Sequence, residues 1–505
     1  MTGVRVVRAR GVRAVLAAVV AAATVAGLAG CTGGSSPDRS LTSGGGPATS
    51  SGPSWGSPSG SGTAPGTAGL ATPMGAKWDW GRFTEFSPFL KSVSGGTTYY
   101  EVVWCDVEKK QGSPDWSSLD RIATRSRQVG VTLMLKLRVG RCWATSGDAQ
   151  HQRGSKAKTE SAMPTDLGAY KAWVHAAVTR YSKLGVHEYA IENEINSASF
   201  WAGTPQQFET LARAASGEIR ASDPEAKVVD AGLSSTSYGY GIADWLLKQG
   251  RDAEAVSAWN AYFERRIGTR GDQLVTVHSR ADLEAALTSE QGARNLAYLD
   301  LMRQLAAAKV TDVRQIHFYE KYSSVPLLFA YLKSHTPYGT PIQAWEVGSF
   351  DKSGATTDDS TKSEEVLKTM SLVLAEGATV AIWLPLAFDP GGRNGDEPRY
   401  GLLEPDGQVR QAGRIFQAMV EASRGAKVVK ISLDGLSGVA FDKGAGATAF
   451  VWSDARTVVQ LPDGAKVASV ESLDQPTGGA TTTVGATPLR ITLPVPTATF
   501  LKEQR

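Results

Sequence analysis

The stretch "YAIENEIN", residues 189–196, decides the fold that we expect for this chain. It opens with apolar residues and closes with two carboxylates around an amide, Glu192, Asn193 and Glu194. A solvated loop can contain such a run by accident. A buried parallel strand that ends at a functional opening contains it for a reason, because the strand is apolar along its length and polar where it emerges. The surrounding sequence has to distinguish the two.

Seven further β-rich runs alternate with helical patterns, which is typical of parallel strands joined by crossover helices. The eight expected strands are residues 76–80, 98–104, 132–139, 189–193, 227–233, 314–319, 341–346 and 379–386. A longer insert, residues 234–313, holds expected helices near 241–267 and 281–308. The pattern over residues 74–424 predicts an α/β fold, a (β/α)8 TIM barrel.

A doubly wound open sheet is the alternative, but the sequence shows no glycine fingerprint for a nucleotide. After the barrel the sequence pattern changes to short runs of alternating apolar and polar residues, separated by turn signals. This pattern over residues 425–505 predicts a small C-terminal antiparallel β-sandwich.

The N-terminal residues are typical of an export signal. Residues 1–30 begin with four arginines and no acid, followed by an apolar run that is short for a membrane span. The run ends in "LAGC" at Cys31, which resembles the lipobox of bacterial lipoproteins. In that family the cysteine is lipidated and becomes the new N-terminus. A plain signal peptide with a coincidental cysteine is the alternative.

Residues 31–73 consist mainly of Gly, Ser, Thr and Pro. Such a segment lacks the apolar surface that offsets the entropy of ordering, so we expect a disordered linker. Together with the lipobox, it predicts a surface lipoprotein anchored to the outer face of the bacterial cytoplasmic membrane and lifted off it by a tether.

Composition excludes several classes of partner. The formal charge of +3 becomes about −1 once the four arginines of residues 1–30 are set aside, which leaves no basic field for nucleic acid or anionic lipid. We therefore expect no nucleic-acid partner, and membrane contact only through Cys31. The sequence is silent on oligomeric state.

Two further cysteines, Cys105 and Cys142, each follow an expected strand, so neighbouring strand ends can bring them together. An exported protein can form a disulfide, and we predict one here. Two separate buried thiols are the alternative. Two cysteines are too few for a Cys-based zinc site, and the six scattered histidines add no ligand spacing, so no metal is implied.

Polar side chains collect at the ends of the expected strands, where the functional groups of such a barrel meet. Trp345 directly precedes Glu346 and points to the opposite face if the strand alternates, so we interpret Trp345 as a packing residue. Glu192 shares a face with Glu194, and both a substrate contact and a buried ion pair are open for it. The candidate site residues are Asn193 and Glu194 after the fourth strand, His317 and Tyr319 on the sixth, Glu346 on the seventh and Trp383 on the eighth.

The motifs that contain these residues resemble those of clan A retaining glycoside hydrolases, the four/seven superfamily. They are "ENEIN", "HFY", "AWEVGSF" and "IWLP", and the early stretch "VVWCDVEKKQGSPDWSSLDRIATRSRQVGVTLMLKLRVG" is also similar. The resemblance covers roughly residues 76–424, and the trailing β-module is similar to the sandwich that many such enzymes append. The partial matches are to the β-xylosidases of family 39 and the β-galactosidases of families 35 and 42.

The resemblance implies a function and a set of roles. Glu194 would be the acid/base, its pKa raised by burial and by neighbouring charge, and Glu346 the ionised nucleophile. Tyr319 would donate to the nucleophile, Asn193 would hold a sugar 2-hydroxyl, and His317 would line the sugar pocket. Trp383 would offer a flat face to the sugar. The two carboxylates suffice for retaining hydrolysis of a β-linked carbohydrate, so no cofactor is implied.

The sequence also departs from the clan. No arginine stands near the end of the second strand, and Arg138 on the third is the candidate replacement. Ile195 follows Glu194, where a proline is common. These departures leave a catalytically inactive carbohydrate-binding lipoprotein as the alternative, and a structural surface protein as a second one. For His317 and Trp383, structural roles in the core remain open.

Overall fold

The computed structural model describes residues 70–151, 159–268, 274–351, 358–391, 398–433 and 435–504. The expected signal peptide, Cys31 and the linker up to residue 69 lie outside the described residues. The globular part begins slightly before the expected boundary at residue 74. Thr72 is buried, and its hydroxyl lies 2.6 Å from that of Ser423, at the end of the last barrel helix.

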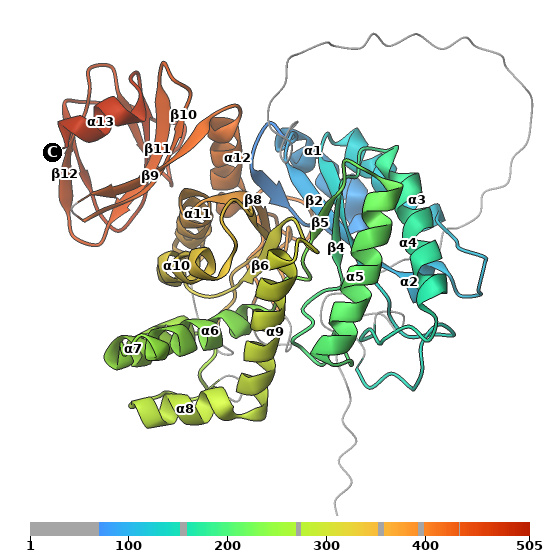
Figure 1. Ribbon diagram of the computed structural model, residues 1–505. Helices are drawn as coiled ribbons and strands as arrows, with labels where there is room; N and C mark the ends of the chain where they lie inside the picture. The colour runs from blue at the N-terminus through green and yellow to red at the C-terminus, as the bar shows by residue number, and fades with distance from the viewer. Residues whose placement is uncertain are drawn as a thin grey trace, which may run out of the picture.

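Eight parallel strands form the predicted barrel (Figure 1). Hydrogen-bonded neighbours follow the order β5-β4-β3-β2-β1-β8-β7-β6. A parallel bridge between Val229 and Val313 joins the two ends of this order, with the Asp230 N–H donating to the Val313 carbonyl at 3.1 Å. The strands are β1 (Met74–Ala76), β2 (Thr97–Val103), β3 (Thr132–Arg138), β4 (Glu188–Ile191), β5 (Lys227–Val229), β6 (Arg314–Phe318), β7 (Ile342–Val347) and β8 (Ala378–Trp383).

Helices surround the barrel. They are α1 (Phe83–Ser92), α2 (Trp104–Val107), α3 (Ser117–Gln128), α4 (Leu167–Ser182), α5 (Pro205–Ser222), α6 (Ser235–Lys248), α7 (Asp252–Tyr262), α8 (Arg280–Thr288), α9 (Glu290–Ala307), α10 (Val325–His335), α11 (Asp359–Ala375) and α12 (Gln411–Ser423). Local chemistry sets their starts: Thr204 forms a capping box with Gln207 ahead of Pro205 in α5. The insert after β5 supplies α6 to α9, and each of its two expected long helices is divided in two.

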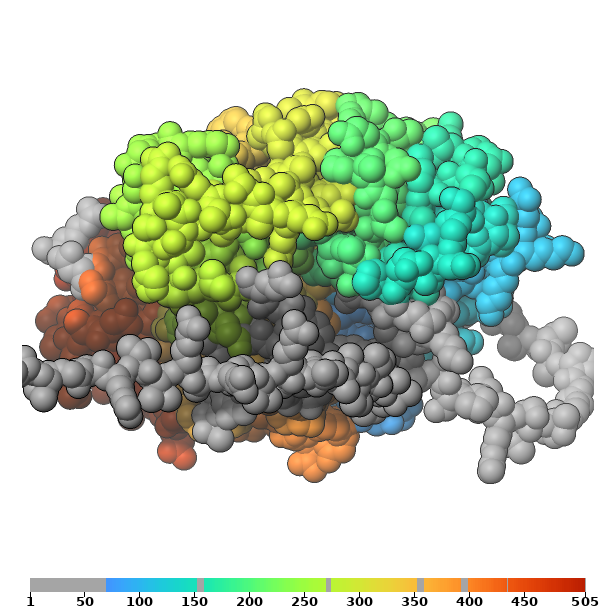
Figure 2. Space-filling view, turned by 90° about the horizontal axis from the view of Figure 1, so that it is seen from below, coloured from blue at the N-terminus to red at the C-terminus, as the bar shows by residue number. Residues whose placement is uncertain are grey.

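The insert helix α9 packs against α5, and α8 packs against α9 on the side away from α5; Figure 2 shows the insert and the α5 side of the barrel as neighbouring surfaces. None of the helices in the described part of the chain combines the length and the apolar character needed to cross a membrane.

The C-terminal segment is the predicted β-sandwich. A six-stranded antiparallel sheet has the order β14-β13-β16-β11-β10-β9, and β12 pairs with β15 in a second sheet. Phe441, Phe450 and Trp452 share a core with the barrel helices, and α11 contacts β9 and β10 (Figure 1). The elements are β9 (Lys427–Leu433), β10 (Leu436–Asp442), β11 (Ala447–Ser453), β12 (Thr457–Gln460), β13 (Lys466–Ser469), β14 (Thr477–Gly478), β15 (Thr481–Val484), β16 (Leu489–Leu493) and α13 (Thr497–Glu503).

The predicted disulfide is present. Cys105 lies in α2 directly after β2, and Cys142 follows β3, the neighbouring strand. Their Cα atoms are 5.5 Å apart, within the usual range for a disulfide. The bond therefore ties together two loops at the end of the barrel where the strands terminate.

Candidate active site

The "ENEIN" stretch leaves β4 in a strained conformation. Glu192 and Glu194 have φ angles of 67° and 42°, and they are two of the three non-glycine residues with positive φ in the described part of the chain. Such angles are costly for residues with a Cβ and persist where surrounding contacts enforce them, often at functional sites. Here the Glu194 N–H donates to the Gly232 carbonyl at 3.0 Å. The strand does not continue its alternation through this segment.

The two glutamates consequently have different surroundings. Glu192 is fully buried, accepts a hydrogen bond from the Val139 N–H at 2.7 Å, and has Arg138 Nε 3.6 Å from Oε2. Burial raises the pKa of Glu192 to about 7, opposed by Arg138. Of its two open interpretations, the structure supports the buried ion pair. The Glu194 side chain is 15% exposed.

Glu346, near the end of β7, is held by three donors. Tyr99 Oη and Lys136 Nζ donate to its Oε1 at 2.9 and 2.7 Å, and Tyr319 Oη donates to its Oε2 at 2.8 Å. The carboxyl is buried, with 8% of the side chain exposed. Burial acts to raise the pKa of Glu346, but His317, Lys136 and Tyr319 outweigh it and hold the pKa well below its usual range. Glu346 is therefore ionised at neutral pH.

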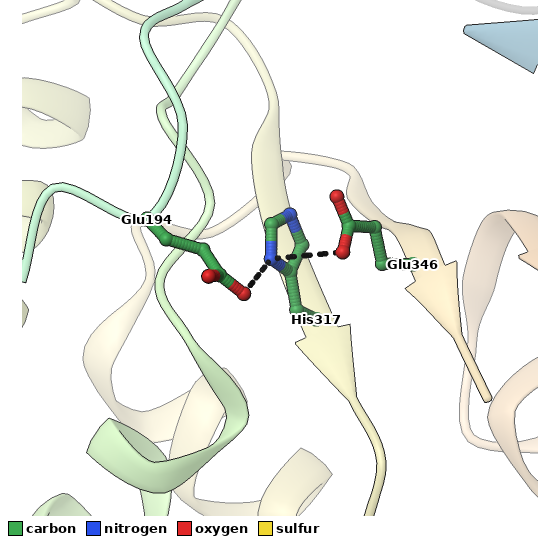
Figure 3. A group of neighbouring side chains, drawn as sticks. All are labelled: Glu194, His317 and Glu346. Carbon is green, nitrogen blue, oxygen red and sulfur yellow. Dashed lines mark hydrogen bonds and ion pairs between the residues drawn. The ribbon is translucent and has the colours of Figure 1, made fainter. Parts of the chain in front are cut away.

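His317 on β6 lies between the two candidate acids (Figure 3). Its Nδ1 is 2.9 Å from Glu194 Oε1 and 3.6 Å from Glu346 Oε2. One atom each from Glu194, His317 and Glu346 lie within 4.8 Å of one another. Two carboxyl groups about 5–5.5 Å apart are typical of retaining glycosidases, whereas inverting enzymes separate them by about 6.5–9.5 Å. The two glutamates thus face one shared site, with one carboxylate oxygen of each within 4.8 Å of the other.

The same three groups have the spacing of a metal site. Lys136 Nζ, however, already donates to Glu346 and lies 3.2 Å from His317 Nε2. A divalent cation bound between these side chains would be repelled by this buried ammonium. We therefore assign no metal to the cluster.

Two further contacting residues, Lys136 and Tyr99, were missed by the sequence analysis. Lys136 lies in the β3 sequence "TLMLKLR", whose central residues are otherwise apolar, and a cation within that apolar run was the signal that could have revealed it. Its Nζ also donates to Asn193 Oδ1 at 2.6 Å. Arg138, the expected replacement for the missing arginine, instead pairs with Glu101 at 3.2 Å and with Glu192.

The expectation that Trp345 points away from Glu346 is wrong. The register between β6 and β7 shifts so that Ile316 pairs with Ala344 and His317 with Glu346, which leaves Trp345 as an extra residue. This bulge turns both side chains toward Tyr99: Trp345 stacks on the Tyr99 ring with centroids 6.0 Å apart, and Glu346 accepts from the Tyr99 hydroxyl. Trp345 is buried and packs inside the barrel, as expected of a packing residue.

Trp383 is fully buried, and its Nε1 donates to the Tyr400 carbonyl at 3.0 Å. It belongs to the core between the barrel and its helices, whereas Val380 and Ile382 face the barrel interior. Neither face of the indole is open to a sugar in this structure, which corrects the expected platform. The structural role in the core is the one that the contacts support.

The fold resembles solved glycoside hydrolases. No protein-family model matches the chain, and no curated protein matches its sequence. A family 39 glycoside hydrolase from Bacteroides cellulosilyticus WH2 superposes with a TM-score of 0.55 at 13% identity, over 84% of this chain and 81% of that one. A family 39 β-xylosidase from Caulobacter crescentus gives 0.50 at 13% identity, over 85% and 97%. A family 39 enzyme from Xanthomonas axonopodis pv. citri gives 0.50 at 12% identity, over 86% and 96%.

Family 39 is one of the three families that the motifs resemble. At such low identity the likeness establishes architecture alone, because one fold carries many activities. The chain thus has the fold of these glycoside hydrolases, a TIM barrel followed by a β-sandwich.

Proposed function

We propose that the chain is a retaining glycoside hydrolase that cleaves a β-linked oligo- or polysaccharide. The observation that carries this proposal is the convergence of Glu194 and Glu346, which are remote in sequence but contribute atoms within 4.8 Å of each other. A carbohydrate-binding protein has no need of two such acids. The fold shared with glycoside hydrolases supports the same function.

In the first step, Glu346 attacks the anomeric carbon while Glu194, protonated, gives its proton to the leaving oxygen. The glycosidic C–O bond breaks as the bond between the carbon and the Glu346 oxygen forms. In the second step, Glu194 accepts a proton from water, and the water oxygen displaces Glu346 from the same carbon. The configuration at that carbon is inverted twice and is therefore retained.

The surroundings of the two acids fit these roles. Glu346 is kept ionised by a cation and two hydroxyl donors. Glu194 is the more accessible of the two and is therefore better placed to reach a leaving group and water. Because His317 lies beside both, the imidazole lines the site where the anomeric carbon has to sit.

The test is hydrolysis of a panel of aryl β-glycosides by the wild-type protein, Glu194→Ala and Glu346→Ala. We expect Glu194→Ala to lose about 10²–10⁴-fold in kcat/KM on substrates with poor leaving groups, which need the acid most. Glu346→Ala should be inactive, and a 2-deoxy-2-fluoro glycoside of the cleaved sugar should label Glu346 in the wild type. Equal inertness of all three proteins across a broad panel would support a glycan-binding protein instead.

We also propose that the protein is exported and lipid-anchored at Cys31 on the outer face of a bacterial cytoplasmic membrane. The lipobox-like "LAGC" and the polar linker support this, and the Cys105–Cys142 disulfide fits an oxidising compartment. Expression in a bacterial host with a clickable fatty acid should label the wild type and leave Cys31→Ser unlabelled. Equal labelling of both would contradict the anchor.

A further inference from the structure

Lys136 is a fully buried cation in the interior of the barrel. Moving an ammonium out of water is costly unless acceptors compensate it, so its contacts define what it does. Its Nζ donates to Asn193 Oδ1 at 2.6 Å and to Glu346 Oε1 at 2.7 Å, and it lies 3.2 Å from His317 Nε2. The Tyr99 ring centroid is 4.3 Å away. Two of the three N–H groups of Lys136 therefore donate to oxygen acceptors within the candidate site.

The two carboxylate oxygens of Glu346 differ in the number of hydrogen bonds that they accept. Oε1 accepts from both Lys136 and Tyr99, whereas Oε2 accepts only from Tyr319 among the residues that the structure describes. A carboxylate oxygen offers about two lone-pair sites, so Oε1 is saturated and Oε2 retains one. Oε2 is also the oxygen nearer to His317 Nδ1, at 3.6 Å, on the side of Glu194. The geometry selects Oε2 as the attacking oxygen.

The same ammonium fixes the Asn193 amide. Because Lys136 is a donor only, the carbonyl oxygen of Asn193 must face it, and the NH₂ group is turned the other way. The contact thereby fixes which way the amide of this buried side chain points. One cation thus orders two neighbouring groups of the site.

We propose that Lys136 is a positioning residue that compensates the Glu346 carboxylate, directs its Oε2 toward the sugar and orients Asn193. This inference rests on the proposed glycosidase function and extends it to a residue that neither the motifs nor the comparisons identify. Lys136 touches neither the sugar nor the leaving group, and it acts through Glu346 and Asn193.

The positive charge also has a kinetic consequence. Glu346 is anionic in the free enzyme and becomes a neutral ester in the glycosyl-enzyme intermediate, so the ammonium stabilises the first state over the second. It favours departure of the carboxylate in the second step. Loss of the charge should therefore slow hydrolysis of the intermediate relative to its formation, and the intermediate should accumulate.

The decisive variant is Lys136→Met, which keeps the shape of the side chain and removes the charge. An opposite charge at this distance lowers a carboxyl pKa by about 1–3 units, so the acidic limb of the kcat/KM profile should move up by about 1–3 pH units in the variant. The other titratable or charged groups near Glu346 are unchanged. They are Tyr99 on β2, Glu194 after β4, His317 and Tyr319 on β6, and Arg399, whose guanidinium lies 5.5 Å from the Tyr319 ring centroid.

A matched control is Arg314→Met. It also removes a buried cation of the barrel, but one that pairs with Asp230 at 2.9 Å. We expect the control to lower the melting temperature without moving the acidic limb. Lys136→Met should also show a pre-steady-state burst of aglycone and a lower apparent KM. The proposal would be overturned if an active Lys136→Met variant kept the acidic limb of its kcat/KM profile in place and showed no burst of aglycone. It would also be overturned if Arg314→Met moved the acidic limb by the same amount as Lys136→Met.

A measurement without substrate keeps the two proposals separable. Lys136→Met leaves a buried carboxylate without its cation, so its melting temperature should fall, and adding Glu346→Gln should recover part of the loss. If the wild type cleaves no glycoside and is not labelled at Glu346, the glycosidase function fails while this comparison still tests the pairing. Additive losses in the double variant would contradict the compensation assigned to Lys136.

Discussion

Replacing Glu192 by Gln should stabilise the protein increasingly as the pH rises. Glu192, the first residue of "ENEIN", is buried, and burial raises its pKa from 4.5 to about 7. A carboxyl whose folded-state pKa is raised contributes stability below pH 4.5, and this contribution is lost as the pH rises toward 7. The difference of about 2.5 pKa units corresponds to about 3 kcal/mol. Gln cannot ionise, and its amide oxygen can still accept from Val139.

The assay is urea unfolding of the wild type and Glu192→Gln at pH 4.5, 6 and 8. The free energy of unfolding of the variant, relative to wild type, should rise by up to about 3 kcal/mol between pH 4.5 and 8, on top of any pH-independent effect of the substitution. Glu188→Gln is a positive control for the pH dependence. Burial also raises the pKa of Glu188 to about 7, but Glu188 lies at the start of the same strand, away from the site. A pH-independent difference for Glu192→Gln would show that Arg138 keeps Glu192 ionised in the folded state and would refute the reasoning.

Three further predictions concern the site and its support. Reducing the Cys105 disulfide, which spans 37 positions, should lower the free energy of unfolding by about 4 kcal/mol in the chain-entropy model, measured by urea unfolding with and without a reductant. Gly232→Ala should lower kcat/KM by on the order of 10²-fold, because an added Cβ would lie 2.6 Å from His317 Nε2 at a backbone φ of +60°; unchanged kinetics would mean that His317 tolerates displacement. Trp383→Phe should lower the melting temperature and leave KM unchanged, since the indole is buried; a large rise in KM with unchanged stability would restore the sugar-platform role.

The strand ends were predictable because their chemistry is local. A buried parallel strand is apolar, so polar residues at or just after its end, such as Glu346 in β7 and Asn193 and Glu194 after β4, mark where it emerges. Seven of the expected strands overlap the observed ones by at least three residues, whereas the first, expected at residues 76–80, is Met74–Ala76 and shares only Ala76 with the expectation. The sandwich was predicted from its short alternating runs and turn signals. The disulfide followed from the placement of two cysteines after neighbouring strands.

The missed features depend on register and burial, which alternation alone does not encode. The bulge at Trp345 adds one residue to β7 and changes which side chains face the interior. Trp383 looked accessible at a strand end but lies on the helix-facing side of β8. The first insert helix ends at Lys248, where Gly250 takes a φ of 72°, and a single glycine was too weak a signal to divide the longer pattern.

Lys136 was missed for a related reason. A lysine within a strand ordinarily indicates an exposed edge, and only the closure of the barrel brings this one among Asn193, His317 and Glu346. The partner of a buried charge is a tertiary fact. The sequence therefore identified the acids of the candidate site but not the cation that compensates them.

The most direct test of the paired acids is the stereochemistry of the product. Proton NMR can follow an aryl β-glycoside that the protein cleaves and identify the anomer released first, before mutarotation. Glu194 and Glu346 at their observed spacing predict the β anomer first. Initial release of the α anomer would mean a single displacement, and Glu346 could not then be the nucleophile.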